Sequence, residues 1–251
     1  TQNNTGLTAL MLAAILNENW VFKFLLNKKA NIHIKDNRGR TAFLFAAEYN
    51  RKGMLKRLIK KRVNINLRDK TGETALMKAA RNGHKGIVKI LLKSKAKYFL
   101  NNPQGQTSLM LAAMNNKAGV FKILMKKRAN IRRRDKDGNA VIVYAVKGGA
   151  HKIVHWLLKK KISANTKDKE GTSILILAAE NGYEKVVKNL LKRKANARMR
   201  KKDGSTLLIS SIEGLQVTIG KIHKRFAYDK NRDTINVMKV HPSEYKPKQP
   251  W

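Results

Sequence analysis

Short apolar segments alternate with polar turns along most of this chain. Residues 69–84 begin with an Asp-Lys-Thr-Gly turn and continue with Thr74 and a run of apolar and small residues. A second apolar segment follows and ends in lysine at Lys93. Threonine favours a helix N-cap and Asp-Gly a turn, so the pattern predicts a turn, a helix, a short loop, a second helix and a loop.

This unit returns at a fixed interval of about 33 residues, within the range typical of stacked repeats. Its turn glycine recurs as Gly6, Gly39, Gly72, Gly105, Gly138, Gly171 and Gly204. The turn begins with Asn3, Asp36, Asp69, Asn102, Asp135 and Asp168. The expected N-caps are Thr8, Thr41, Thr74, Thr107, Ser173 and Thr206. The second helices are expected to bury Leu25-Leu26, Leu58-Ile59, Leu91-Leu92, Leu124-Met125, Leu157-Leu158 and Leu190-Leu191.

The chain resembles the ankyrin-repeat family. Residues 74–77 (Thr-Ala-Leu-Met) stand where the family has Thr-Pro-Leu-His, and Ala79-Ala80 and Asn82-Gly83-His84 follow at the family's positions. The resemblance covers roughly residues 3–226 and implies an all-α solenoid of about seven stacked helix pairs, joined by short β-turn or hairpin loops. We therefore expect a solenoid over residues 1–227. The resemblance implies this fold but does not by itself imply a function, because the family is used for binding many kinds of partner.

Three places depart from the pattern. The fifth repeat has Asn-Ala-Val-Ile at residues 139–142. Tyr98-Phe99-Leu100 joins the third repeat to the fourth, where neighbouring repeats have polar residues. The seventh repeat decays, as expected of a terminal cap. Residues 228–251 contain three prolines and predict an extended tail, in which Tyr245 and Trp251 are candidate partner-binding anchors.

Charge is the outlying property of the composition. The chain has 55 Lys and Arg against 16 Asp and Glu, a formal net charge of +39. An AT-rich genome favours lysine, but such a genome tolerates glutamate codons as well as lysine codons, and only eight glutamates are present. A chain with this imbalance is expected to bind polyanions.

The positive charge follows the repeat in three columns. A triplet ends each second helix, and its Lys and Arg are our candidate binding residues: Lys28, Lys29, Lys60, Lys61, Arg62, Lys93, Lys95, Lys126, Lys127, Arg128, Lys159, Lys160, Lys161, Lys192, Arg193 and Lys194. A second column comprises Lys23, Lys56, Lys89, Lys122, His155 and Lys188. A third comprises Lys35, Arg68, Asn101, Arg134, Lys167 and Arg200.

Attraction to the helix dipole can explain one lysine per helix, at about 0.3–1 kcal/mol, but not three. At the third triplet position the family has glycine in a left-handed conformation, whereas this chain has Lys29, Arg62, Lys95, Arg128, Lys161 and Lys194. If that conformation is kept, each of these residues costs on the order of 1 kcal/mol. Six repetitions of this cost suggest a purpose outside the fold.

Catalytic signatures are missing from the sequence. It has no Gly-rich phosphate loop after a strand, no nucleophile elbow and no cysteine, so we expect neither an enzyme nor a cofactor. His151 and His155 lack an apparent third metal ligand, and no metal is expected. We interpret Met11, Met77 and Met110 as core, and Trp20 and Trp156 likewise. No apolar run approaches the ~20 residues needed to span a bilayer.

Two functions remain in competition. The first is an RNA-bound structural subunit of a ribosome or other ribonucleoprotein, with rRNA on the basic triplets and neighbouring proteins on the solenoid and tail. The second is a protein-interaction adaptor on an acidic surface such as a microtubule; membrane-surface binding is weaker, because no amphipathic anchor is present. We expect an intracellular protein and favour the mitochondrion. The chain begins at Thr1, inside a repeat turn and without a visible signal peptide, so a removed leader or upstream repeats are expected.

Overall fold

The computed structural model describes residues 1–199, 227–229 and 234–236. These divide into two compact units, Thr1–Ile162 and Ser163–Trp251. In the first unit the helices are α1 (Ala9–Leu16), α2 (Asn19–Asn27), α3 (Ala42–Glu48), α4 (Lys52–Lys60), α5 (Ala75–Asn82), α6 (Lys85–Lys93), α7 (Ser108–Met114), α8 (Ala118–Lys126), α9 (Val141–Lys147) and α10 (His151–Lys159). The second unit contains α11 (Ile174–Glu180), α12 (Glu184–Leu191) and the strands β1 (Ala227–Asp229) and β2 (Thr234–Asn236).

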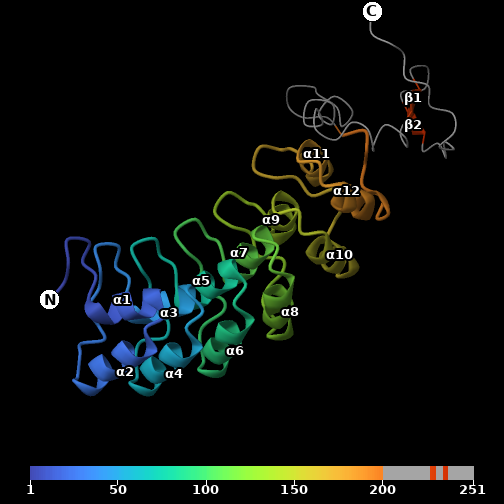
Figure 1. Cartoon of the computed structure of the whole chain (residues 1–251). Coiled ribbons are helices and arrows are strands. Elements are labelled where there is room, and N and C mark those ends of the chain that lie inside the picture. Colours follow the sequence, from blue (N-terminus) through green and yellow to red (C-terminus); the bar gives the residue numbers. More distant parts are fainter. Residues whose placement is uncertain (200–226, 230–233, 237–251) are drawn as a thin grey trace, which may run out of the picture. The chain divides into compact units, whose positions relative to one another are not determined.

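In the first unit the ten helices form five antiparallel pairs, which stack side by side (Figure 1). The first helices, α1, α3, α5, α7 and α9, pack against one another in one row, and α2, α4, α6, α8 and α10 pack in a second row. The second unit repeats one such pair, α11 with α12, and pairs β1 with β2 in antiparallel register. The predicted all-α repeat fold is confirmed.

The core lies between the two rows of helices. In α3 every residue from Ala42 to Ala47 is buried, because the first helices α1 and α5 pack against it. The second helices are amphipathic: α6 buries Ile87, Val88 and Leu91 and leaves Lys89 exposed. This burial pattern leaves the outer face of the second row to polar side chains.

The predicted buried pairs of the second helices are confirmed for at least one member of each pair. Leu58, Leu91, Leu124, Leu157 and Leu190 are buried, and in the first repeat the buried member is Leu26. Except for buried Leu158, the other members are half-buried. Met11, Met77 and Met110 are fully buried, as predicted.

Capping follows the sequence with two exceptions. The hydroxyls of Thr8, Thr74, Thr107 and Ser173 each accept a hydrogen bond from the backbone N–H three residues later. Thr41 makes no such bond, and in the divergent fifth repeat Ala140 has no side chain that could cap. Thr206 and the predicted seventh repeat lie outside the described residues.

The loop turns are built around the aspartate at their first position. Asp69 Oδ1 accepts the backbone N–H groups of Thr71 and Glu73, both at 3.0 Å. Gly72 has φ of +73°, and a Cβ there would lie 2.3 Å from Cδ of Pro103 in the next repeat. Glycine is therefore required both by the turn and by the close approach of neighbouring loops.

The predicted boundary between residues 227 and 228 falls within β1. Tyr245 and Trp251, the anchors predicted in the tail, lie outside the described residues. The extents of the solenoid and the tail therefore stay predictions.

Within the described part of the chain, no helix is long and apolar enough to cross a membrane.

Candidate polyanion-binding surface

We use the name basic edge for the sixteen Lys and Arg residues of the six triplets, of which five triplets lie in the first unit and one in the second. Each triplet lies at the C-terminal end of a second helix, and all sixteen side chains are exposed. The five triplets of the first unit follow one another along the row α2, α4, α6, α8 and α10. Stacked helices lie about 8–10 Å apart, so cationic groups recur at about that interval along this row.

The third residue of every triplet has the left-handed backbone conformation. The φ angles are +56° at Lys29, +59° at Arg62, +64° at Lys95 and +59° at Arg128, Lys161 and Lys194. The backbone N–H of each donates to the carbonyl three residues earlier, as in Arg128 N to Met125 O at 2.9 Å. All six cationic residues therefore keep the left-handed conformation that the family's glycine has at this position, so the condition on which the strain argument depends is met.

No acidic side chain in the described residues forms an ion pair with the basic edge. The acidic residues lie elsewhere: Asp36 pairs with Arg40, and Glu184 with Lys188. Lys28 has a different contact, because its Nζ lies 5.8 Å from the centroid of the Phe24 ring. Within the described residues, the positive charge of the edge therefore has no acidic counterpart.

The second column lies on the same helix face as the first triplet position, because the two are four residues apart. The sequence analysis missed that Lys52 and Lys85 extend this face by another turn, giving rows such as 52–56–60 on α4. The lysine spacing of i, i+4 and i+8 was the available signal. The basic surface therefore covers the outer face of α4 and α6 as well as their ends.

Glycines on neighbouring helices accommodate these added lysines. A Cβ on Gly86 of α6 would lie 2.4 Å from Lys52 Cε, and a Cβ on Gly119 of α8 would lie 1.9 Å from Lys85 Cε. The aliphatic stems of Lys52 and Lys85 thus lie across the next helix. This packing places each ammonium group between two helices of the second row.

The third column is partly structural. A guanidinium nitrogen of Arg68 donates to the carbonyl of Asn101 at 2.6 Å, and Arg134 donates to the carbonyl of Gly138. These two guanidinium groups already donate hydrogen bonds to loop carbonyls, so they are less available to a ligand. Arg200 lies outside the described residues.

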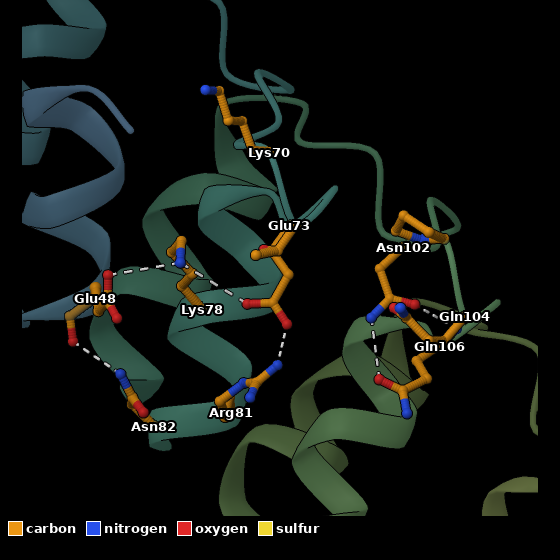
Figure 2. Close-up of a pocket in the computed structure, with 11 residues that line it drawn as sticks. Glu48, Lys70, Glu73, Lys78, Arg81, Asn82, Asn102, Gln104 and Gln106 are labelled. Carbon is orange, nitrogen blue, oxygen red and sulfur yellow. Dashed lines mark hydrogen bonds and ion pairs between the residues drawn. The ribbon is translucent and has the colours of Figure 1, made fainter. Parts of the chain in front are cut away.

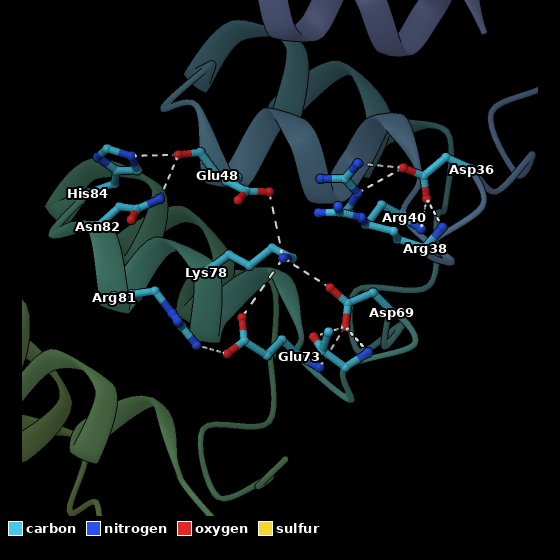
Figure 3. Close-up of polar contacts among 11 residues, drawn as sticks. Asp36, Arg38, Arg40, Glu48, Asp69, Glu73, Lys78, Arg81, Asn82 and His84 are labelled. Carbon is cyan, nitrogen blue, oxygen red and sulfur yellow. Dashed lines mark hydrogen bonds and ion pairs between the residues drawn. The ribbon is translucent and has the colours of Figure 1, made fainter. Parts of the chain in front are cut away.

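On the first-helix side of the same unit, a buried lysine lies among carboxylates (Figure 3). Lys78 Nζ is 3.0 Å from Asp69, 3.6 Å from Glu48 and 3.8 Å from Glu73. Arg81 also pairs with Glu73. Burial raises the pKa of Asp69, but hydrogen bonds from Thr71 and Lys78 outweigh it and hold that pKa below 3.8.

A related network joins the fourth and fifth repeats. The Tyr144 hydroxyl donates to Asp135 and accepts from Gln106 Nε2 at 3.1 Å. Burial and the bond to Asp135 raise the pKa of Tyr144. Burial also raises the pKa of Asp135, but hydrogen bonds from Tyr144 and Asn139 outweigh it and leave that pKa lowered. These groups stabilise the turn.

A polar pocket of about 470 Å³ opens between the loops and first helices of the second to fourth repeats (Figure 2). Its lining includes Glu48, Lys78 and Arg81 together with the amides of Asn102 and Gln106. Lys78 and Arg81 are paired with Glu73, and Asn102 donates to Gln106 at 3.0 Å. The pocket's polar groups therefore largely bind one another and tie adjacent repeats together.

The sequence interpretation of Trp20 as a core residue is wrong. Its side chain is 73% exposed and stacks on Phe24, with ring centroids 5.4 Å apart. It lies at the outer end of the first repeat, where no described repeat covers it. Trp156 is half-buried and stacks on Phe121 of the preceding second helix.

Among the described residues, no group of three or more His, Asp and Glu could hold a metal ion.

Comparison with known proteins supports the repeat assignment. A family model described as ankyrin repeats matches residues 10–102, 43–135, 96–168 and 142–222. The crystal structure of the human ASB11 ankyrin repeat domain is similar, with a TM-score of 0.72 at 19% sequence identity. That similarity covers 83% of this chain and 97% of the human domain. A search of curated protein sequences finds no match.

Proposed function

The chain belongs to the ankyrin-repeat family, whose members are interaction scaffolds, and on that premise we propose that its basic edge binds the phosphate backbone of a structured RNA. The protein then acts as a structural subunit of a ribonucleoprotein, such as a ribosome. Other surfaces of the repeats bind neighbouring proteins. The mitochondrial setting stays a prediction.

The observation that carries this proposal is the left-handed cation that ends each of six second helices. Glycine would remove the backbone strain at these positions, and the fold itself does not need a charge there. The six side chains are exposed and form no ion pair within the described residues. A regularly spaced polyanion supplies the missing partner.

The mode of recognition follows from the residue types. Flexible lysines act as point charges that suit phosphate, and the edge lacks a regular ladder of aromatic rings for stacking on successive bases. We therefore expect binding through backbone and shape, with little sequence preference. Affinity will fall steeply with salt, because phosphate neutralisation releases counterions.

Two variants with equal charge loss test the location of the site. The first replaces Lys126, Lys127 and Arg128 by glutamine. The second replaces the exposed loop residues Arg38, Lys70 and Lys136 by glutamine, which lowers the net charge equally but leaves the edge intact. Affinity for an RNA hairpin is measured across a salt series.

We expect the triplet variant to lose affinity about tenfold or more and to reduce the salt slope by about 2, whereas the loop variant changes both much less. Equal effects of the two variants would mean that net charge and not the edge determines binding. Unchanged affinity in both would contradict the proposal.

The ankyrin fold favours a second candidate, an adaptor that docks its basic edge on an acidic protein surface. The RNA measurement is therefore repeated with an acidic polymer of the tubulin type as competitor. RNA binding that the competitor barely disturbs supports the ribonucleoprotein function. Weak RNA binding with tight polymer binding supports the adaptor.

A further inference from the structure

One loop position of the first unit is aromatic where the other repeats have a polar or charged residue. Phe99 lies between α6 and α7 and is 56% exposed. Other repeats have polar or charged residues at its position: His33, Asn66, Arg132, Asn165 and Arg198. Described repeats flank Phe99 on both sides, so its exposure is not that of an end repeat. The packing of the repeats does not account for an exposed ring here.

Phe99 is held in a defined position. Tyr98 and Phe99 are the central residues of a turn closed by Leu100 N and Lys97 O at 3.5 Å, and their rings meet edge to face with centroids 5.9 Å apart. The carbonyls of this loop accept from both neighbouring repeats. Arg133 donates to Phe99 O at 2.9 Å, and Arg68 donates to Asn101 O at 2.6 Å. The ring is thus presented to solvent on a loop that is clamped from both sides.

Positive charge surrounds this loop in the sequence and in the fold. Phe99 follows the triplet cations Lys93 and Lys95 and the exposed Lys97 within six residues. The guanidinium of Arg133 lies at the Phe99 carbonyl, and exposed Arg132 occupies the Phe99 position of the next repeat. An exposed aromatic ring among cations matches a nucleotide, which combines an apolar base with an anionic phosphate.

We propose that Phe99 stacks on an unpaired nucleobase of the RNA bound at the basic edge. This inference rests on the proposed function and adds a subsite to it. Cations of the edge hold the phosphates on either side of the nucleotide, and the base is unpaired because bases inside a duplex do not present their faces. The rest of the edge reads the backbone alone.

The test compares two RNA hairpins that differ by one bulged nucleotide, with 2-aminopurine as the bulged base. The wild-type protein is expected to bind the bulged hairpin more tightly and to quench its 2-aminopurine fluorescence. Phe99→Ala should lower affinity for the bulged hairpin about tenfold, which is in the range known for one base stacked on an aromatic ring. It should change affinity for the paired hairpin little. Phe99→Trp should restore the preference.

Trp20→Ala is the matched control, because it removes another exposed aromatic ring at the end of the unit. It should leave the preference for the bulged hairpin unchanged. If Phe99→Ala leaves that preference intact, or weakens both hairpins equally, the stacking site is wrong while RNA binding at the edge stands. If the wild-type protein binds neither hairpin, both this inference and the proposed function fail.

Discussion

Two groups of cations in the same unit have opposite surroundings. Lys78 is 8% exposed and has three carboxylates within 4 Å, from the second and third repeats. Lys126, Lys127 and Arg128 at the end of α8 are exposed, and no carboxylate pairs with them among the described residues. The contrast separates charge that holds the fold together from charge that is directed outward.

The difference also shows where the few acidic residues are used. Asp36, Asp69 and Asp135 each bind backbone N–H groups of their own turn with one oxygen. The other oxygen is bound by a different partner in each repeat, namely Arg40, Lys78 or Tyr144. Because these carboxylates are bound within their own repeats, they do not neutralise the positive charge of the triplets.

Replacing Lys78 by methionine should show the largest effect on stability. It keeps most of the side-chain volume but leaves Asp69, Glu48 and Glu73 without their shared cation. Breaking a buried ion pair from one side costs about 3–5 kcal/mol, which urea unfolding would measure. Lys126→Met, at an exposed position, should change the free energy of unfolding by less than about 0.5 kcal/mol. If both substitutions change the free energy of unfolding by a similar small amount, Lys78 does not stabilise the fold more than the exposed triplet cations do.

Acid should reduce the stability that the ion pairs of Lys78 provide, whereas the basic edge, in the part of the chain that the structure describes, pairs with no carboxylate that acid could protonate. The pKa of Asp69 is lower in the folded protein than its usual 3.8, so its stabilising contribution is present above pH 3.8 and is lost as pH falls through the folded value. Asp69→Asn should reduce stability at pH 7 by about 1–3 kcal/mol and flatten the dependence on pH below 4. Unfolding measured from pH 2 to 7 checks this. A mutant curve parallel to the wild type would exclude Asp69 as the titrating group.

Adjacent substitutions at one triplet should separate binding from stability. Arg128 has φ of +59°, whereas Lys127 has φ of −84°. Arg128→Gly should therefore stabilise the protein by about 1 kcal/mol, and Lys127→Gly should not. Both remove one cation, so both should lower RNA affinity by a similar factor. Thermal unfolding and RNA titration measure the two effects, and equal stability changes would refute the strain argument.

The sequence by itself determined the repeat, the turns and the positions of the triplets. These follow from local rules, since a 33-residue interval, an N-cap threonine and a glycine turn act within one repeat. The sequence also marked Arg128 as the position where the family has a left-handed glycine, but the structure decided that the arginine keeps that conformation. The comparison with known proteins agrees with the repeat.

Only the tertiary structure decided which side chains meet across repeats. Lys78 finds Glu48 on the preceding first helix, Lys52 lies across Gly86 of the following second helix, and Trp20 is exposed because no described repeat covers it. These contacts join residues about one repeat apart, and periodicity alone does not reveal them. Burial and pairing depend on the neighbouring repeat, which is why the sequence located the charges and the structure showed which of them are unpaired.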